Sequence, residues 1–282
     1  MRTFIRALLR WIILAVDAVG GRTSVGHYIY GQIIGIALDR TAIVDHNGVI
    51  LQFHIPNAIN RFRTNTFSTK EPETLSWIDK IPNGSVLWDI GANVGLYTCY
   101  AAVAKHCRVL AFEPSIFNLE MLTRNVFLNE STGLVTIIPL PLSDNTSINR
   151  LNMTSTEWGG ACSTFGESYG YDGKPLAKKF EFSTMGISID DAIRLLGLLP
   201  PDFIKMDVDG IEHLILKGGV DALRHVQGVL IEINDDFPLQ SENAARYLLA
   251  AGLVLQDKRH CEAAIGSPFA ATCNQIWGRG RG

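Results

Sequence analysis

The clearest chemical pattern in the sequence lies in residues 86–97, where a short apolar run leads to Asp89 and then to Gly91 and Gly95. Glu113 follows 24 positions after Asp89, at the end of a second apolar run. A glycine turn between a strand and a helix lets backbone N–H groups approach a ligand closely, because glycine has no Cβ and tolerates positive φ. A carboxylate after the second strand can accept both hydroxyls of a ribose. The spacing therefore predicts a nucleoside-binding βαβ unit.

This turn differs from the G-x-G-x-x-G fingerprint of dinucleotide-binding proteins. It reads acid-x-Gly-x-Asn-x-Gly from Asp89 to Gly95, which resembles the first motif of class I methyltransferases, enzymes that bind S-adenosylmethionine (SAM). A tight strand-to-helix turn without a ligand fits the same residues. Two further polar residues follow the next strands: Asn118, near the expected ribose carboxylate, and Ser143, where an adenine ring would be flanked. The expected cofactor-binding residues are Asp89, Gly91, Asn93, Gly95, Glu113, Asn118 and Ser143.

Apolar runs alternate with helical periodicity along most of the chain. The expected strands are 86–88, 108–112, 135–139, 180–187, 203–207 and 229–233, with the last strands at 252–256 and 274–277. The expected helices are 96–104, 115–128, 190–196, 211–217 and 241–251, with Ser115 and Ser241 as N-caps. This alternation predicts an α/β fold, a doubly wound Rossmann-like sheet with its ligand at the carboxyl ends of the strands. We expect a small N-terminal helical and β extension over residues 1–80 and a SAM-binding domain over 81–282.

Residues 1–20 have the pattern of an amphipathic helix. Arg2, Arg6 and Arg10 recur every four residues, which puts them on one helix face beside apolar residues. The apolar run Trp11–Val16 is too short to span a bilayer, and Arg10 leaves too short an apolar region for a signal peptide. The segment is either a helix packed on the body of the protein or a basic helix resting on a membrane surface. We expect packing, with peripheral membrane contact as the alternative.

The rest of the extension predicts a hairpin and a short helix. Asn47 and Gly48 join two expected strands, 41–44 and 49–54, and this dipeptide is typical of a two-residue hairpin turn. Pro72 suits the first turn of a helix that leads into the main sheet.

Two stretches allow both a structural and a binding role. Residues 145–181 lack regular periodicity and mix aromatic residues with glycines, which is typical of a substrate-binding loop or lid but also of a surface hairpin. Arg61 and Arg63 precede the expected lead-in helix. We expect a solvated surface turn there, with a positive rim near the cofactor or an acidic acceptor as the alternative.

Composition narrows the class of protein. The chain has 282 residues, of which 47% are apolar and 19% charged, as in folded globular proteins. A net charge of −3 argues against broad affinity for nucleic acid, so we expect no nucleic-acid partner. The five cysteines form no C-x-x-C pair, which argues against a structural zinc site and favours reduced thiols and a cytoplasmic location. The cysteines are Cys99, Cys107, Cys162, Cys261 and Cys273.

Four blocks carry a more specific resemblance: residues 70–77, 88–97, 112–125 and 203–212. Through them the chain resembles the FkbM family of SAM-dependent methyltransferases, from about residue 53 to residue 232. The resemblance implies a class I sheet with a final antiparallel hairpin, and O-methylation of a sugar or another natural-product hydroxyl. It does not fix the acceptor, which we expect to be a small molecule or a glycan. The family usually has glutamate where this chain has Asp209, which keeps the charge but shortens its reach.

Methyl transfer to an aliphatic hydroxyl is an in-line displacement that needs an aligned acceptor and help in removing its proton. Asp207 ends the fourth strand, which lies beside the transferred methyl group in this architecture, and Asp209 follows in a glycine turn. Both are candidate catalytic residues, with Asp207 the favoured base. Because the two carboxylates are close in sequence, one is expected to have a raised pKa.

A metal ion would be another way to activate the hydroxyl. Glu232 and Asn234, around the end of the fifth strand, are candidate oxygen ligands for Mg²⁺ together with Asp207. Nothing in the sequence requires this metal. The alternative for Glu232 is an ion pair with Lys205, whose ammonium group would otherwise be buried without a partner.

Two other classes of protein share part of the pattern. A nicotinamide-dependent oxidoreductase would need glycine at Asn93 and a third glycine near Thr98. A non-catalytic SAM-binding protein would have lost the carboxylates that follow the fourth strand, and these are present. Amino-methylation of nucleic acid is disfavoured, because enzymes of that kind typically have Asn/Asp-Pro-Pro-aromatic where this chain has Asp207-Val-Asp-Gly.

Overall fold

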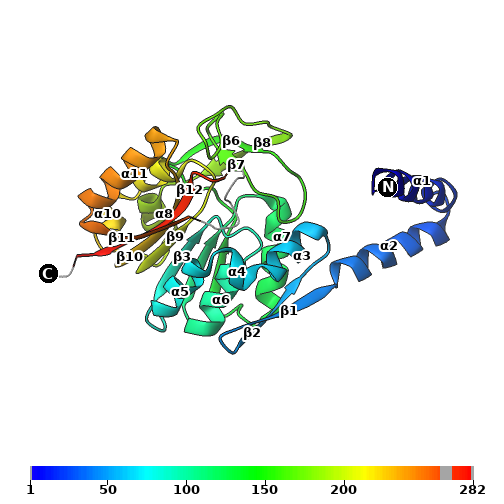
Figure 1. The fold of residues 1–282 in the computed structure, drawn as a ribbon, viewed down its shortest axis with the longest axis horizontal. Helices are drawn as coiled ribbons and strands as arrows, with labels where there is room; N and C mark the ends of the chain where they lie inside the picture. Colours follow the sequence, from blue (N-terminus) through cyan, green and yellow to red (C-terminus); the bar gives the residue numbers. More distant parts are fainter. Residues whose placement is uncertain (1, 261–268, 281–282) are drawn as a thin grey trace.

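The protein is described by a computed structural model that covers residues 2–260 and 269–280. Its centre is a seven-stranded sheet with the strand order β11-β12-β10-β9-β3-β4-β5 (Figure 1). The strands are β3 (Val86–Ile90), β4 (Arg108–Phe112), β5 (Val135–Ile138), β9 (Phe203–Met206), β10 (Gly228–Asn234), β11 (Leu253–His260) and β12 (Thr272–Arg279).

Four neighbouring pairs in this sheet are parallel, from β5 through β4, β3 and β9 to β10. β12 runs antiparallel to both β10 and β11, and so it forms the final hairpin with β11. The predicted doubly wound sheet with a final antiparallel hairpin is confirmed. Because the parallel strands all end at one edge, the loops that follow β3, β4, β5, β9 and β10 gather there.

Both faces of the sheet are buried, as expected of parallel strands. Along β3, Trp88 and Ile90 belong to one core and Leu87 to the other, which is the two-residue alternation of a strand. The first core is covered by α8 (Ile189–Leu196), α9 (Glu212–Lys217), α10 (Val220–Leu223) and α11 (Pro238–Ala250). The second is covered by α5 (Pro72–Lys80), α6 (Leu96–Lys105) and α7 (Ile116–Leu128).

One of the two expected helix N-caps is confirmed, and the other lies inside its helix. Ser115 caps α7 as expected, and its hydroxyl accepts a hydrogen bond from the backbone N–H of Asn118. α11 begins at Pro238 instead of after Ser241, because proline suits the first turn of a helix and the preceding Phe237 provides the capping position. The predicted cap Ser241 therefore lies inside the helix.

Residues 145–186 form a small antiparallel sheet in the order β7-β6-β8, built from β6 (Ser147–Met153), β7 (Ser163–Phe165) and β8 (Phe180–Gly186). The sequence predicted a strand at β8 and an irregular stretch before it. Polar residues fill most of β6, and only Leu151, Asn152 and Met153 are buried, so the usual alternation of apolar residues is weak.

The N-terminal extension contains the predicted hairpin, β1 (Thr41–His46) and β2 (Val49–His54). Asn47 and Gly48 both have positive φ in its turn, as a two-residue hairpin requires. Two short helices, α3 (Ala58–Asn65) and α4 (Phe67–Lys70), then lead to α5, the predicted lead-in helix.

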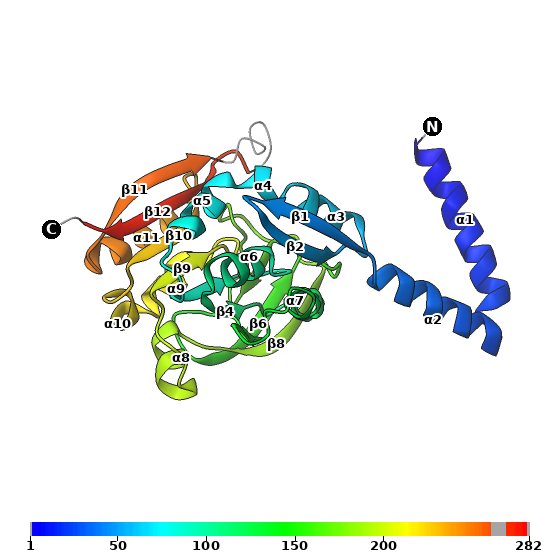
Figure 2. The ribbon, with the colours of Figure 1, turned by 90° about the horizontal axis from the view of Figure 1, so that it is seen from below.

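The expectation that residues 1–20 pack on the body is wrong. They form α1 (Arg2–Gly20), which is followed by α2 (Ser24–Leu38), and the two helices project away from the sheet domain (Figures 1 and 2). Every large apolar side chain of α1 that the structure describes is more than half exposed. Within the described residues, no helix combines the length and apolar character needed to cross a membrane.

Four cysteines are free thiols: Cys99, Cys107, Cys162 and Cys273. Cys261 lies outside the described residues.

Candidate active site

The predicted glycine turn lies between β3 and α6, and two of its positions require glycine. Gly91 has φ of +80°, and a Cβ at this position would lie 1.9 Å from the backbone oxygen of Asp207 on the neighbouring strand end. Gly95, the N-cap of α6, has φ of +82°, and its Cβ would lie 2.4 Å from Cδ1 of Leu122. The loop after β3 can therefore pass close to the end of β9 only because position 91 is glycine.

Glu113 occupies the end of β4, as predicted, and faces the glycine turn. It is buried, and its two carboxylate oxygens accept backbone hydrogen bonds of 2.8 Å from Asn93 and from Ser115. Burial raises the pKa of Glu113 to about 7, although these hydrogen bonds act in the opposite direction. Each oxygen has a further lone pair with which to accept a ribose hydroxyl.

A cavity opens beside Glu113, with about 560 Å³ of non-protein space that includes an opening to solvent. We call it the first cavity. Its lining combines the polar side chains of Glu113 and Asn118 with apolar side chains that could flank a planar ring. The apolar side chains include Phe112, Leu142, Leu151, Phe165 and Ile215. Ser143 is not among the lining residues, and its neighbour Leu142 takes the place expected for it.

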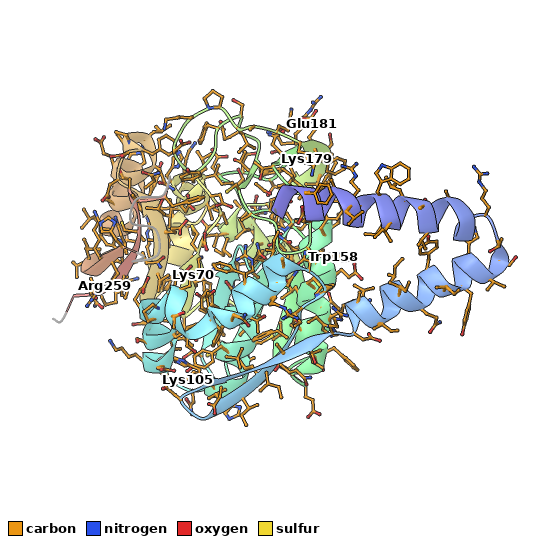
Figure 3. All side chains as sticks on the ribbon, turned by 45° about the vertical axis from the view of Figure 1, so that its right-hand side comes forward. Lys70, Lys105, Trp158, Lys179, Glu181 and Arg259 are labelled. Atoms are coloured by element: carbon orange, nitrogen blue, oxygen red, sulfur yellow. The ribbon has the colours of Figure 1, made fainter. Side chains whose placement is uncertain are left out.

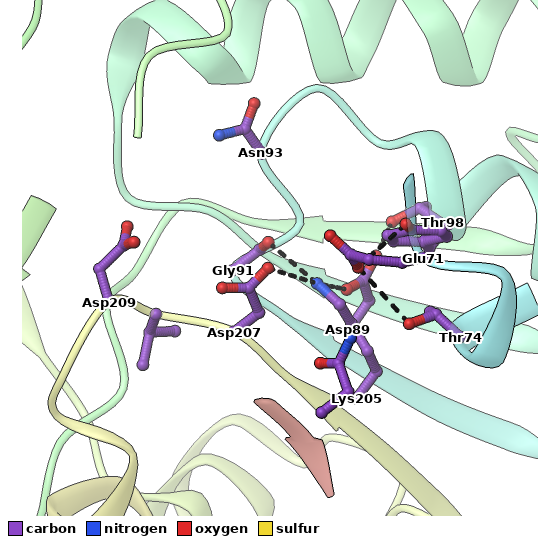
Figure 4. Close-up of polar contacts among 12 residues, drawn as sticks. Glu71, Thr74, Asp89, Gly91, Asn93, Thr98, Lys205, Asp207 and Asp209 are labelled. Atoms are coloured by element: carbon purple, nitrogen blue, oxygen red, sulfur yellow. Dashed lines mark hydrogen bonds and ion pairs between the residues drawn. The ribbon is translucent and has the colours of Figure 1, made fainter. Parts of the chain in front are cut away.

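Asp89 lies under the turn and lines neither cavity. It is buried, and its Oδ2 accepts a 2.5 Å hydrogen bond from the Thr98 hydroxyl, while Oδ1 lies 3.4 Å from Nζ of Lys205 (Figure 4). Because Asp89 lies beneath the turn, its contacts with Thr98 and Lys205 hold the loop and Lys205 in place.

Lys205 connects the turn with the end of β9. Its ammonium group is buried, lies 3.8 Å from Oδ2 of Asp207, and donates a 3.5 Å hydrogen bond to the backbone oxygen of Gly91 (Figure 4). Burial alone would lower the pKa of Lys205, but the negative charges of Asp89 and Asp207 raise it. The alternative pairing of Lys205 with Glu232 is therefore wrong. On this side of β9, the carboxylates nearest the ammonium group are those of Asp89 on β3 and of Asp207 at the end of β9.

Asp207, Asp209 and Glu232 form a carboxylate cluster, in which one oxygen of each lies within 4.8 Å of the others. Burial would raise the pKa of Asp207, but the positive charge of Lys205 and of two other nearby cations brings it below its usual value. Burial and the charge of Asp207 raise the pKa of Asp209 to about 6. The same two causes raise the pKa of Glu232 well above its usual value. The predicted raised pKa is thus found on Asp209, not on Asp207.

Asn234 does not join this cluster. Its side-chain oxygen accepts a 2.9 Å hydrogen bond from the backbone N–H of Asp236, and it is absent from the lining of both cavities.

A second, larger cavity adjoins the first and holds about 1540 Å³ of non-protein space, part of it open to solvent. It is lined by all three carboxylates of the cluster and by the side chains of Arg63 and Lys70. The two cavities share Gly91, Asn93, Ala161, Asp207 and Asp209 as lining residues. A ligand in one cavity would therefore meet a ligand in the other at the two aspartates.

Residues 157–162, which we call the roof segment, lie across this junction. The guanidinium of Arg63 donates two hydrogen bonds to the backbone oxygen of Gly159. Arg61 and Arg63 lie in α3 and not in the expected surface turn, and the alternative of a positive rim near the cofactor or an acidic acceptor stays a prediction. The side chains of Asn93 and Asn118 both donate to the backbone oxygen of Gly160, at 2.9 and 3.0 Å.

The roof segment also reaches the carboxylate cluster, because the backbone N–H of Cys162 donates a 2.7 Å hydrogen bond to Oδ2 of Asp209. Sequence reasoning missed this contact. The Trp-Gly-Gly stretch at 158–160 was the only signal that the loop could approach the site so closely.

In the sheet, the antiparallel strand β12 lies beside β10, the last of the parallel strands, and Glu113 follows β4. Together these features define a class I SAM-dependent methyltransferase. Residues 89–252, more than half of the chain, match the model of the methyltransferase FkbM domain. The chain belongs to this family, which excludes the nicotinamide-dependent alternative and makes the protein an enzyme.

Among curated proteins, the hexuronic acid methyltransferase AglP of Haloferax volcanii is 25% identical over 206 residues, which are 70% of this chain and 76% of that protein. Among solved structures, TYW2 of M. jannaschii in complex with AdoMet is 14% identical, with 85% of this chain and 86% of that chain covered and a TM-score of 0.45. A precorrin-6y C5,15-methyltransferase of Geobacter metallireducens is 12% identical, covering 75% and 87%, with a TM-score of 0.44. These two structural scores are too low to support an argument about function.

Proposed function

We propose that this methyltransferase transfers the methyl group of SAM to a hydroxyl oxygen of a sugar, and that glycans containing a hexuronic acid are the first acceptors to test. The observation that carries the proposal is the junction of the two cavities at Asp207 and Asp209. A cofactor in the first cavity and an acceptor in the second would meet beside two carboxylates of different pKa.

The residues of the first cavity suit SAM. Gly91 lets the turn pass against the backbone at the end of β9, and Glu113 offers a buried carboxylate for the ribose hydroxyls. Asn93 and Asn118 would contribute from the turn and from the start of α7, and Gly95 would keep the turn short. When bound, SAM supplies an electrophilic methyl group on a positively charged sulfur. Asp89 would act indirectly, through Lys205, and a direct role for Ser143 has no support from its position.

Asp209 is the better candidate for the base. A general base works best when its pKa lies near the operating pH, and the pKa of about 6 meets this condition. The acceptor hydroxyl would lie in the second cavity. Its oxygen would bond to the methyl carbon as the carbon–sulfur bond breaks and S-adenosylhomocysteine leaves, and the hydroxyl proton would pass to Asp209. Asp207 would stay ionised beside Lys205, and its negative charge at the junction would favour a positively charged donor.

The charged side chains around the second cavity and the likeness to AglP both support a sugar hydroxyl as the acceptor. The negative charge of Asp207 would repel a carboxylate acceptor at the junction, whereas it would not repel a neutral hydroxyl. Arg63 and Lys70 line the second cavity and could bind the acid group of a hexuronic acid while a hydroxyl of the same sugar reaches the junction. The likeness to AglP, named as a hexuronic acid methyltransferase, agrees with this arrangement.

A divalent cation is the second way in which the cluster could activate a hydroxyl. Asp207, Asp209 and Glu232 are the hard oxygen ligands that Mg²⁺ prefers. Lys205 already supplies a positive charge beside Asp207, and burial and the charge of Asp207 raise the pKa of Glu232, which favours its neutral form, so the protein's own groups reduce the negative charge of the cluster. We therefore expect activity in the presence of a chelator. Activity that is lost with the chelator and restored by Mg²⁺ would instead assign a metal to the cluster.

The proposal is tested with purified enzyme, methyl-labelled SAM, and matched glycosides of a hexuronic acid and of the corresponding neutral hexose. We expect label in a glycoside with the wild-type enzyme and at least a hundredfold less with Asp209→Asn. Asp221→Asn is the control, because the side chain of Asp221 is 80% exposed and far from both cavities. No transfer to any glycoside by an enzyme that binds SAM would contradict the proposed acceptor class. A cytoplasmic location, expected from the cysteines, stays a prediction.

A further inference from the structure

The helices α1 and α2 present an apolar surface that the sheet domain does not cover. Figure 3 shows the two helices extending from the globular part of the molecule, with side chains all along them. The following large apolar side chains are each more than half exposed: Phe4, Leu8, Trp11, Ile12, Ile13, Leu14 and Val16 on α1, and Val25, Tyr28, Ile29, Ile33, Ile34 and Ile36 on α2. So many exposed large apolar side chains on two neighbouring helices indicate an interaction site.

The two helices are held in a defined arrangement. A Cβ on Gly26 would lie 1.5 Å from the backbone oxygen of Gly20, so the close crossing at the elbow depends on this glycine. The hydroxyl of Thr23 caps α2 by accepting a hydrogen bond from the backbone N–H of Gly26. The apolar side chains are therefore presented by folded helices and not by a loose tail.

The charges of this segment differ from those of the whole chain. Residues 1–40 contain five arginines and two aspartates and no lysine or glutamate, whereas the chain as a whole has a net charge of −3. On α1, Phe4, Leu8 and Trp11 share one side of the helix, and the exposed Arg10 lies on the opposite side. α2 contains no charged Asp, Glu, Lys or Arg residue at all. A basic charge beside a broad apolar face complements an anionic lipid surface.

Neither helix of this segment, as far as the structure describes it, combines the length and the apolar character of a membrane span. α2 has 15 residues, which corresponds to about 22 Å and is shorter than the hydrocarbon core of a bilayer at about 30 Å. α1 is longer but carries charge along one side. Helices with these properties lie in the plane of the membrane–water interface, where exposed Trp and Tyr side chains are also favoured.

We propose that α1 and α2 form a membrane-binding arm that rests on an anionic lipid surface, with its apolar side chains at the acyl boundary and its arginines at the headgroups. The arm would hold the methyltransferase domain at the membrane and so bring the second cavity close to acceptors located there. The proposal does not depend on which acceptor the enzyme uses.

The test is co-sedimentation of the full-length protein with vesicles of phosphatidylcholine alone and of phosphatidylcholine mixed with phosphatidylserine. We expect binding to the mixed vesicles that weakens as salt is added, because the headgroup attraction is screened. The double variant Arg10→Ala/Arg22→Ala should bind about 25-fold more weakly, since each arginine near such a surface contributes about fivefold. Trp11→Ser/Ile29→Ser should lose most binding to both kinds of vesicle.

The matched control is Ile50→Ser/Ile148→Ser, which removes two apolar side chains that are exposed on the body of the protein. This variant should bind as the wild type does. Absence of wild-type binding to the mixed vesicles at low salt would overturn the proposal, as would equal losses in the arm and control variants. A wild-type dimer that the Trp11→Ser/Ile29→Ser variant converts to a monomer, without vesicle binding, would assign the arm to a second copy of the chain instead.

Discussion

Replacing Glu113 by glutamine should weaken cofactor binding in a way that depends on pH. The carboxylate is buried, and each of its oxygens already accepts one backbone N–H, so two lone pairs are left for the ribose hydroxyls. Glutamine keeps the shape but removes the charge and turns one acceptor into a donor. Loss of one of the two hydrogen bonds to the charged group weakens binding by about 1.5–3 kcal/mol, which corresponds to about 10- to 150-fold in the dissociation constant.

The pH dependence follows from the pKa of Glu113 of about 7. Below this value the carboxyl group of the free enzyme is protonated, and it must lose its proton to bind the ribose hydroxyls at full strength. The affinity of the wild-type enzyme should therefore rise about tenfold per pH unit up to about pH 7 and then level off, while the affinity of Glu113→Gln stays flat. The difference between the two proteins should be largest at about pH 8 and small at about pH 6.

Calorimetric titration with S-adenosylhomocysteine, the stable product form of the cofactor, measures both effects. Thermal unfolding gives an independent check. A raised pKa in the folded state means that folding binds a proton between about pH 4.5 and pH 7, so the free energy of unfolding falls as pH rises through this window, by about 3 kcal/mol. Glu113→Gln should lack this fall. Equal affinities of the two folded proteins at about pH 8 would refute the assignment of Glu113 to the ribose.

Three further substitutions test the rest of the site. Gly91→Ala should abolish cofactor binding, because its Cβ would lie 1.9 Å from a backbone oxygen, whereas Gly133→Ala, at an open position, should bind normally in the same titration. Asp209→Asn should lower kcat by about 10²- to 10⁴-fold and remove the rise of kcat/KM through about pH 6, and a profile that keeps this rise would exclude Asp209 as the base. Lys205→Met should lower the free energy of unfolding by about 3–5 kcal/mol, since Asp89 and Asp207 would lose their shared cation, and an unchanged melting curve would contradict that role.

The sequence was sufficient for the sheet and for the turn that carries the cofactor site. Every residue of β3 is buried, and all are apolar except Asp89, as expected of a strand buried on both faces; the glycines that follow fix the turn by their positive φ. Glu113 could be predicted because its position depends only on the end of the neighbouring strand. These features are local, and so they can be read from spacing alone.

The contacts between distant segments could not be predicted in the same way. Asp89 has the expected spacing but lies beneath the turn, because Thr98 and Lys205 bind its oxygens from other elements. The roof segment reaches Asp209 from a region without periodicity. The order of the two aspartate pKa values depends on which carboxylate lies nearer to Lys205, and no pattern in the sequence encodes this.

The arm is the clearest case of a pattern that was interpreted wrongly. An amphipathic helix looks the same in sequence whether its apolar face meets a protein core or a lipid surface. In the structure the described apolar side chains of α1 stay exposed, which contradicts packing on the body, and membrane contact stays a proposal.

The most direct test of the proposed chemistry is to locate the new methyl group on a hexuronic acid glycoside by mass spectrometry and NMR, after reaction with methyl-labelled SAM. The arrangement of Asp207 and Asp209 at the junction of the two cavities predicts a methyl ether on a ring hydroxyl, stable to mild alkali and absent when Asp209→Asn replaces the wild-type enzyme. A methyl ester on the acid group that forms equally well with Asp209→Asn would contradict the proposal, because a carboxylate acceptor needs no base.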